Sequence, residues 1–442
     1  MQPMIFRKLT VLLSLLPGYL GLFAQSNAQL DMLKDFSKRV TPHGYDSNLR
    51  YTNLLPGGKL QYLFPLYQLF RQEAEFKNRL GFQSYNLEMS KSASFLEDYQ
   101  NALDYQTRNY DSLDPATERD LKKAIGEIKG IVHADAAKYI GFAALKYRVI
   151  MINESYNKPL HRAFIISCLD ELYRRGFRYF AWETFSGNAK ASLNKLNINT
   201  GYFTMEPVGG ELVRIALEKG FKLVPFSDTT GNQTPALRDS IQASRLYSVL
   251  KKDSGARILV LAAYEHIAKR SDGPHFSSVS IAFKKISGIN PLCIDQVSLC
   301  DESEFSYGKA FYELYTARFP VQFPSIPLLD NQAVNITNNT GYDLCIVHPH
   351  TQFRDNRPGW LSLNGLRKAV YVKATVPGTF LVQAYYEEET RSCGPGQLVP
   401  ADQTYLSTNH DSYLLYLRKG KYLVTMRSIG YHLIGRLNLE VN

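Results

Sequence analysis

The segment 148–185 constrains the fold of this 442-residue chain more than any other. An apolar run at 148–152 ends in a polar turn, a helical pattern follows at 159–175, and a second apolar run at 178–182 ends in an acid. This order is typical of a strand–helix–strand unit whose two strands run parallel in one sheet. The alternation continues to about residue 330, so the sequence predicts an α/β protein.

The rest of the expected core follows the same pattern. Further strands are expected at 221–226, 257–263 and 292–297, with helices at 207–219, 235–252 and 274–286. In RILVLAA every residue after the arginine is apolar, as expected of a parallel strand that is covered on both faces. We therefore expect a mainly parallel sheet flanked by helices.

The sections on either side of this core have different patterns. The polar residues 29–58 predict an extended segment, and the run up to 146, including HADAAKYIGFAALKY, has helical spacing. Beyond residue 366 the sequence reads as strands, with RKGK as a hairpin turn. The predicted organisation is a helical N-terminal section at 29–146, an α/β core at 147–365 and a β-rich C-terminal tail at 366–442.

Residues 1–28 have the pattern of a signal peptide. Arg7 and Lys8 precede an apolar stretch, and Ser26-Asn27-Ala28 offers small residues for cleavage. The apolar stretch is short for a membrane span, and no later segment is long enough to cross a bilayer. An uncleaved anchor is the alternative, and either interpretation predicts an extracytoplasmic protein.

The charge distribution and the cysteine spacing limit the kinds of partner and metal site that we expect. The formal charge is +10, but Lys and Arg are spread among acids without a basic run, so we expect no nucleic-acid binding. The five Cys form no CxxC pair, which argues against a thiolate zinc site. In an exported protein, Cys300 and Cys393 leave room for one disulfide.

Polar side chains follow most of the predicted strands at the point where each strand ends. The carboxyl ends of parallel strands rim the crevice where ligands bind, so these side chains should converge on a small-molecule ligand or substrate. The expected catalytic residues are Glu154, Glu183 and His266. The expected ligand-binding residues are Tyr156, His161, Arg162, Asp228, Asp295, His348 and Arg357.

The two glutamates are expected to be neighbours because adjacent parallel strands would deliver them to one edge of the sheet. Carboxylates and an imidazole in one crevice supply a general acid or base. Glu154, Glu183 and His266 would also be the ligands of a divalent metal, if one binds. Structural roles remain open for several residues, such as a helix cap for Glu154 and a turn cap for Asp295. The sequence has no GxSxG elbow, P-loop, GxGxxG or HExxH motif.

The stretches NESYNKPLHR, WETF and AAYEHI resemble motifs of the superfamily that includes the ChaN-like haem-binding proteins, the erythromycin esterases, and the TraB and Tiki proteins. The resemblance covers roughly residues 140–300. It implies a parallel-sheet core and a hydrolytic site formed by Glu154, Glu183 and His266. Asn153 and Tyr156 depart from the Gly and His that are usual in the first motif.

The resemblance leaves three functions open. The first is a hydrolase in which Arg162 steadies an anionic group. The second is a non-catalytic protein that binds haem or another small ligand, with Tyr156 as a potential axial ligand to iron. The third is a surface interaction module with a vestigial site.

Overall fold

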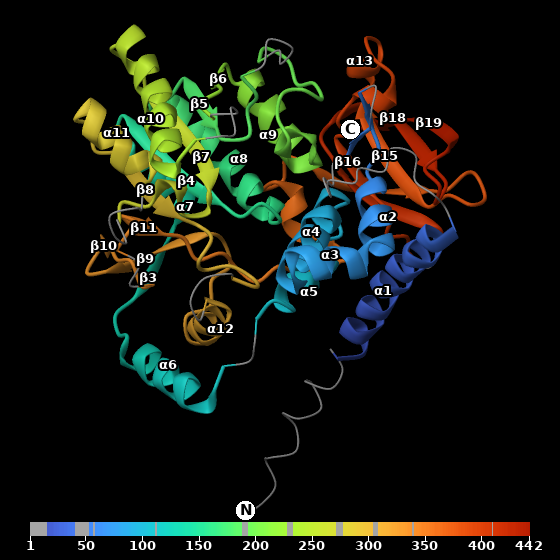
Figure 1. Cartoon of the computed structure of the whole chain (residues 1–442), viewed down its shortest axis with the longest axis horizontal. Coiled ribbons are helices and arrows are strands. Elements are labelled where there is room, and N and C mark those ends of the chain that lie inside the picture. Colours follow the sequence, from blue (N-terminus) through green and yellow to red (C-terminus); the bar gives the residue numbers. More distant parts are fainter. Residues whose placement is uncertain are drawn as a thin grey trace, which may run out of the picture.

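The computed structural model describes residues 16–39, 53–55, 58–110, 113–187, 193–227, 233–270, 277–303, 308–337, 340–408 and 410–442. In Figure 1 the α/β core lies on the left, the C-terminal strands lie on the right, and most of the N-terminal helices lie between and below them. The expected fold class is confirmed: a parallel sheet flanked by helices, with a helical N-terminal region and a β-rich C-terminus.

The core sheet has six parallel strands in the order β11-β8-β4-β7-β5-β6. Its strands are β4 (Val149–Glu154), β5 (Tyr179–Trp182), β6 (Lys222–Val224), β7 (Ile258–Ala263), β8 (Leu292–Asp295) and β11 (Leu344–Cys345). Helices α8 (Pro159–Arg174), α9 (Pro207–Glu218), α10 (Pro235–Lys252) and α11 (Val279–Ser287) connect them. The predicted elements of this core are therefore present, most of them within a few residues of the expected ends.

Alternate residues of β4 pack on opposite faces of the sheet. Ile150 and Ile152 belong to a core cluster with the apolar side chains of α8 and α9. Val149 and Met151 belong to a second cluster with those of α10 and α11. Every residue of β4 and β7 is buried, which explains why both strands are apolar almost throughout.

The sheet order corrects one expectation. Strands β4 and β5 are not adjacent, because β7 pairs with both of them and lies between. The ends of β4 and β5 are therefore two strand spacings apart, roughly 10 Å. The two glutamates still lie at the same edge of the sheet, but contact between them is not set by a direct strand pairing.

The N-terminal section differs from the expected pattern at its start. Residues 29–39, expected to be extended, are the end of helix α1 (Leu16–Arg39). Leu30 and Leu33 are buried, and the Gln29 side chain donates hydrogen bonds to the Tyr405 carbonyl and the Ser407 hydroxyl. The helix forms because it docks on distant parts of the chain, a tertiary contact that local polarity does not reveal. The short strands β1 (Leu54–Leu55) and β2 (Lys59–Leu60) follow α1.

Helices α2 (Phe64–Arg71), α3 (Glu73–Leu80), α4 (Phe82–Phe95), α5 (Tyr99–Thr107), α6 (Pro115–Glu127) and α7 (Ala136–Ala143) complete this section. The Asp114 carboxylate caps α6, with Pro115 at the first helical position. The helix expected from residue 133 begins only at Ala136. The residues before it form β3 (Val132–Asp135), which pairs antiparallel with β9 (Ser325–Leu329). Helix α12 (Gly308–Arg318) precedes β9, and β10 (Gln332–Ala333) follows it.

The C-terminal region consists of two antiparallel sheets. One pairs β14 (Lys368–Lys373) with β17 (Ser412–Leu417). The other has the order β16-β15-β18-β19, formed by β15 (Leu381–Tyr386), β16 (Asp402–Thr404), β18 (Gly420–Arg427) and β19 (Leu433–Val441). The expected hairpin at RKGK is wrong, because β17 and β18 belong to different sheets. The shorter elements are β12 (Phe353–Arg354), β13 (Arg357–Pro358), α13 (Glu387–Thr390) and the 3₁₀ turns η1 (Phe203–Met205), η2 (Tyr264–Ile267), η3 (Gly359–Ser362) and η4 (Pro395–Gln397).

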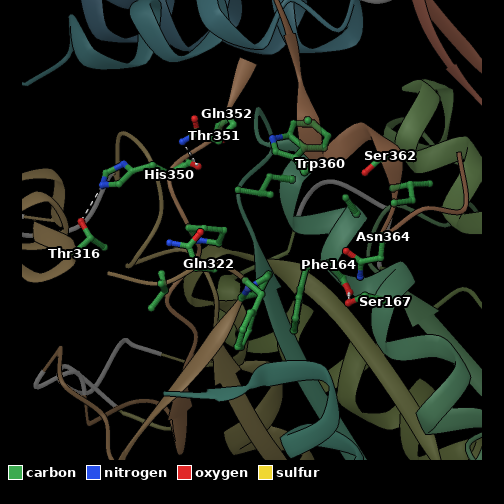
Figure 2. A pocket seen from close by; sticks show the side chains of 18 of the residues that line it. Phe164, Ser167, Thr316, Gln322, His350, Thr351, Gln352, Trp360, Ser362 and Asn364 are labelled. Carbon is green, nitrogen blue, oxygen red and sulfur yellow. Dashed lines mark hydrogen bonds between the residues drawn. The ribbon is translucent and has the colours of Figure 1, made fainter. Parts of the chain in front are cut away.

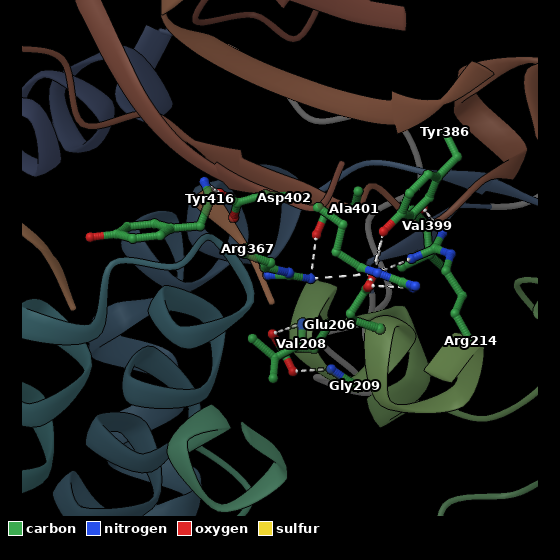
Figure 3. Close-up of polar contacts among 12 residues, drawn as sticks. Glu206, Val208, Gly209, Arg214, Arg367, Tyr386, Val399, Ala401, Asp402 and Tyr416 are labelled. Atoms are coloured by element: carbon green, nitrogen blue, oxygen red, sulfur yellow. Dashed lines mark hydrogen bonds and ion pairs between the residues drawn. The ribbon is translucent and has the colours of Figure 1, made fainter. Parts of the chain in front are cut away.

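A buried ionic cluster joins α9 to the C-terminal region. The Glu211 carboxylate accepts a hydrogen bond from the Tyr386 hydroxyl at 2.9 Å and lies 3.3–3.6 Å from guanidinium nitrogens of Arg214, Arg367 and Arg418. Figure 3 shows Tyr386, Arg214 and Arg367 gathered above α9. Burial alone would raise the pKa of Glu211, but the three guanidinium groups lower it below its usual value. The cluster therefore holds a charged carboxylate inside the protein.

The cysteines and the lengths of the helices bear on two other expectations. None of the five cysteines forms a disulfide, so the Cys300–Cys393 bond that the sequence allowed is absent. In the described ranges, no helix combines the length and apolar character needed to cross a membrane.

A stability prediction follows from the pair Arg357–Asp402, whose side chains are both fully buried and 2.6 Å apart. Replacing Asp402 with Ala leaves the Arg357 charge in the interior without its partner. We expect Asp402→Ala to lower the free energy of unfolding by about 3–5 kcal/mol in a denaturant titration. The exposed Asp31→Ala is the control and should change it by no more than about 0.5 kcal/mol. A loss for Asp402→Ala as small as that of the control would contradict the prediction.

Candidate functional site

The first cluster at the carboxyl edge of the sheet is a buried chain of ionic contacts. Glu154, the last residue of β4, accepts hydrogen bonds from Arg162 Nε at 2.9 Å and from Trp182 Nε1 at 2.5 Å. Arg162 Nη1 donates to Glu206 at 3.1 Å, and Arg162 Nη2 donates to the Tyr156 carbonyl at 3.1 Å. Glu206 accepts from the first amides of α9 and so caps that helix.

This arrangement corrects the role expected for Arg162. Its side chain is 0% exposed, and each of its three nitrogens donates a hydrogen bond within the protein. Because it is fully buried against Glu154 and Glu206, it is not accessible to an anionic ligand. Glu154 is buried with it, and burial raises the pKa of Glu154 despite the opposing effect of the Arg162 charge. Both side chains are buried, so they support the neighbouring backbone and do not line a ligand site.

The second cluster is a carboxylate–imidazole pair that reaches solvent. Glu183 follows β5, and His266 lies in η2 after β7. His266 Nδ1 lies 2.8 Å from one carboxylate oxygen of Glu183 and 3.1 Å from the other, and the Ala263 amide donates to Glu183 at 2.9 Å. The side chains of His266 and Glu183 are 29% and 16% exposed. Two of the three expected catalytic residues thus form one unit, which we call the Glu183–His266 pair.

The pair shifts both protonation equilibria toward charged forms. Burial would lower the pKa of His266, but the hydrogen bond and charge of Glu183 raise it above the usual value. Burial would raise the pKa of Glu183, but His266 and the Ala263 amide lower it. The carboxylate also fixes Nδ1 as the partnered ring nitrogen, which leaves Nε2 for another group.

Tyr156 lies near this pair, with its ring stacked on Phe203 at a centroid distance of 4.7 Å and an interplanar angle of 11°. The pKa of Tyr156 is raised by burial and by the charges of Glu183 and Glu154, so its hydroxyl keeps its proton. Within the described part of the chain this hydroxyl makes no hydrogen bond. It is therefore a free donor at the edge of the sheet.

Arg238 is a cation near the pair that the sequence analysis missed. It lies in the first turns of α10, its side chain is 35% exposed, and it pairs with Asp239 at 3.1 Å. Its charge contributes to the pKa shifts of His266, Glu183 and Tyr156. The only local signal was its position just after the Thr234-Pro235 helix start, which indicates a helix end at the rim but not a cation facing the pair.

The remaining expected ligand-binding residues are placed differently. His161 and His348 are buried, with ring centroids 5.6 Å apart, and His161 Nδ1 accepts the Ser155 amide. Asp295 is buried, bonds to Asn153 and caps the turn after β8 through the amides of residues 297 and 298.

Arg357 and Asp228 complete the set. Arg357 is fully buried against Asp402 of β16 and donates to the Gln403 carbonyl, so it does not clamp a ligand as the sequence analysis expected. Asp228 lies outside the described residues.

Glu97 is an unexpected buried acid beside the first cluster. It lies between α4 and α5 with a left-handed backbone, φ 59°, and neither carboxylate oxygen has a hydrogen-bond partner among the residues that the structure describes. Its pKa is raised well above the usual value by burial and then by the charges of Glu206 and Asp402. Glu97 is therefore a neutral acid over much of the pH range in which surface glutamates are charged.

The cofactors left open by the sequence do not fit these residues. Among the described residues, no group of three or more His, Cys, Asp or Glu side chains is arranged to hold a metal ion. Burial and the charges of Glu183 and Glu154 raise the pKa of Tyr156, which opposes formation of an iron–phenolate bond there.

No protein-family model matches the sequence, and no curated protein matches it. Among solved structures, the chain is similar to the type III effector HopBA1, with 10% identity, a TM-score of 0.31, and coverage of 50% of this chain and 96% of that one. A structure described as bacterial protein toxins matches with 11% identity, a TM-score of 0.30, and coverage of 55% and 56%. The C-terminal region of Pasteurella multocida toxin matches with 11% identity, a TM-score of 0.28, and coverage of 90% and 62%. These likenesses are too slight to bear on the fold or function of this chain.

A titration prediction follows from the Glu183–His266 pair. We expect the His266 pKa, measured from ring carbon chemical shifts, to lie above its usual value in the wild type and to fall in Glu183→Gln. The cause is the loss of the carboxylate charge beside Nδ1. Glu265→Gln removes a neighbouring acid that makes no hydrogen bond to this imidazole, and it should leave the His266 pKa nearly unchanged. An unchanged His266 pKa in Glu183→Gln would contradict the prediction.

A stability prediction follows from Glu97. Because its folded pKa is raised, the wild type is penalised once the pH passes the unfolded value, and the penalty grows until the pH reaches the folded value. Glu97→Gln should therefore gain stability relative to the wild type as the pH rises from about 5 to about 8, by at most about 1.4 kcal/mol per pH unit. Urea unfolding across this range measures the difference, with the exposed Glu388→Gln as control. A difference that does not change with pH would argue against a buried neutral Glu97.

Proposed function

We propose that this protein is a hydrolase in which the Glu183–His266 pair activates water for attack on a carbonyl carbon, as in ester hydrolysis. The observation that carries the proposal is the 2.8 Å contact between a carboxylate and an imidazole that both reach solvent at the carboxyl edge of a parallel sheet. Open α/β sheets bind ligands at this edge. A carboxylate-oriented imidazole is a common general base.

The chemistry proceeds through His266 Nε2. With Nδ1 held by Glu183, Nε2 accepts a proton from water as the water oxygen bonds to the substrate carbonyl carbon. Glu183 stabilises the imidazolium that forms, without taking the proton. When the tetrahedral intermediate collapses, Nε2 returns the proton to the leaving oxygen, so the imidazole is regenerated.

Tyr156 and Arg238 supply the electrostatic part. The Tyr156 hydroxyl keeps its proton and has no partner in the described chain, so it serves as a hydrogen-bond donor to the developing oxyanion. Arg238 takes the place first expected for Arg162 as the cation that favours an anionic substrate. Glu154 and Arg162 are positioning residues that hold the backbone of Tyr156 and the end of β5.

The motif resemblance to the Tiki, ChaN-like and erythromycin esterase superfamily supports this proposal at Glu183 and His266. In those relatives a His stands where this chain has Tyr156. We propose that the base function rests on His266 here and that Tyr156 acts as a donor. An exported location remains part of the proposal, through the signal pattern at 1–28.

The activity test uses a panel of carboxylic esters, lactones and amides, each in neutral and anionic forms. Against the substrate turned over best, we expect His266→Ala to lower kcat/KM by about 10²–10⁴ and Glu183→Gln to lower it to a similar extent. The exposed His432→Ala is the matched control and should retain activity. Full activity of Glu183→Gln on that substrate would overturn the assignment.

The pH profile tests the same assignment independently. Because the base must be neutral, kcat/KM should rise with pH through the raised pKa of His266, and the rise should move to lower pH in Glu183→Gln. Arg238→Ala should raise KM for anionic substrates and leave neutral ones nearly unaffected. A KM increase of equal size for both forms would assign Arg238 a structural role.

A further inference from the structure

A cavity lies away from the Glu183–His266 pair and shares no residue with it. It has a volume of about 480 Å³ and lies between the outer face of α8, the segment 320–324 and the segment 349–364. The size is within the range of small-molecule sites. Figure 2 shows Gln322 on one side of this cavity, Ser362 and Asn364 on the other, and Trp360 at its upper margin.

The lining carries no formal charge from acids or strong bases. Asp, Glu, Lys and Arg make up 21% of the chain, yet none of the nineteen lining residues is of these types. The one titratable side chain is His350, and both of its ring nitrogens are engaged, with Asp301 and with Thr316. A charged ligand would leave water without a counter-charge, so the cavity selects for a neutral ligand.

The floor and the walls are apolar and aromatic. Leu160, Ala163 and Phe164 of α8 are buried and form the floor. The half-buried Trp360 is held in a T-shaped contact with Tyr99 at 5.2 Å, and the ring of Phe323 is 47% exposed. Aromatic faces of this kind pack against the C–H faces of a ring.

The rim supplies groups that both donate and accept hydrogen bonds. The side chains of Gln322, Ser362 and Asn364 make no hydrogen bond within the described part of the chain, and the buried Trp360 Nε1 is likewise without a partner there. Amide and hydroxyl groups match the hydroxyls of a polyol, which also donate and accept. The rim therefore complements a ligand with many hydroxyls.

The turn that presents Ser362 and Asn364 has an unusual backbone. Leu363 and Asn364 have φ values of 48° and 56°, in the left-handed region, and Gly365 follows with φ 88°. A left-handed leucine is rare, and it is held here by burial of its side chain, which is 4% exposed. The strained backbone of this turn directs the side chains of Ser362 and Asn364 toward the cavity.

From these observations we infer that this cavity is a binding site for a neutral sugar, a mono- or disaccharide without carboxylate, phosphate or amino groups. Trp360 and Phe323 provide the stacking faces, and Gln322, Ser362 and Asn364 bond the ring hydroxyls. The site is independent of the proposed hydrolase, since none of its residues contacts the Glu183–His266 pair.

The experiment is saturation-transfer NMR on the full chain with glucose, N-acetylglucosamine, maltose and cellobiose, against glucuronic acid and glucosamine as charged analogues. We expect at least one neutral sugar to bind and the charged analogue to bind about tenfold more weakly or not at all. Free nucleosides are included because they are also neutral and flat. Binding of a nucleoside in preference to every sugar, or equal binding of charged and neutral sugars, would overturn the inference.

Single substitutions test whether the sugar binds in this cavity. Trp360→Ala and Asn364→Ala should each weaken binding of the neutral sugar by about tenfold or more. The matched control Gln83→Ala removes an exposed amide on α4 and should bind as the wild type does, as should His266→Ala. Trp360→Phe keeps an aromatic face and should retain part of the affinity even if Trp360→Ala destabilises the chain. Binding that survives both Trp360→Ala and Asn364→Ala, or no binding by any sugar of the panel, would refute the site.

Discussion

The arrangement of the candidate site depends on the buried contacts of Arg162 with Glu154 and Glu206. One guanidinium lies between two carboxylates in an interior where an unpaired charge would be costly. The contacts join the end of β4 to the starts of α8 and α9. Through its third nitrogen Arg162 holds the Tyr156 carbonyl, and through Glu154 it fixes Trp182, which directly precedes Glu183. The backbone positions of Tyr156 and Glu183 therefore share one support.

The two glutamates at the edge of the sheet show how environment assigns roles to the same side chain. Glu154 is enclosed, and its pKa is raised. Glu183 reaches solvent beside His266, and its pKa is lowered. The nearby charge of Glu183 contributes to the raised pKa of Glu154, so ionisation of one carboxyl opposes that of the other. Glu183 is partly exposed and Glu154 is enclosed, so only Glu183 is placed to contact a substrate.

The sequence predicted the core because the signals there were local. Apolar runs indicated β4 and β7, and the helical pattern between two such runs indicated α8. The prediction from sequence was wrong where contacts with a distant segment determine the local structure. Helix α1 forms against residues 405–407, and β17 and β18 separate because each finds a different partner strand.

The same limit applies to the site. The strand ends placed Glu183 and His266 at one edge, and the structure brings them into contact. Arg162 looked available because a side chain at a helix start is often exposed, and only the three-dimensional fold shows Glu206 enclosing it. Arg238 was missed because its relation to His266 arises from packing of α10 beside the strand ends and has no spacing in the sequence.

The ionic cluster around Glu211 has a consequence for the order of events during synthesis. Two of the guanidinium groups that neutralise this carboxylate belong to residues 367 and 418, far downstream of α9. While the ribosome is still making the C-terminal strands, Glu211 of α9 has only Arg214 as a counter-ion, and the other two do not yet exist. The nascent core cannot close over this helix until nearly the whole polypeptide has emerged, so the final docking step is posttranslational.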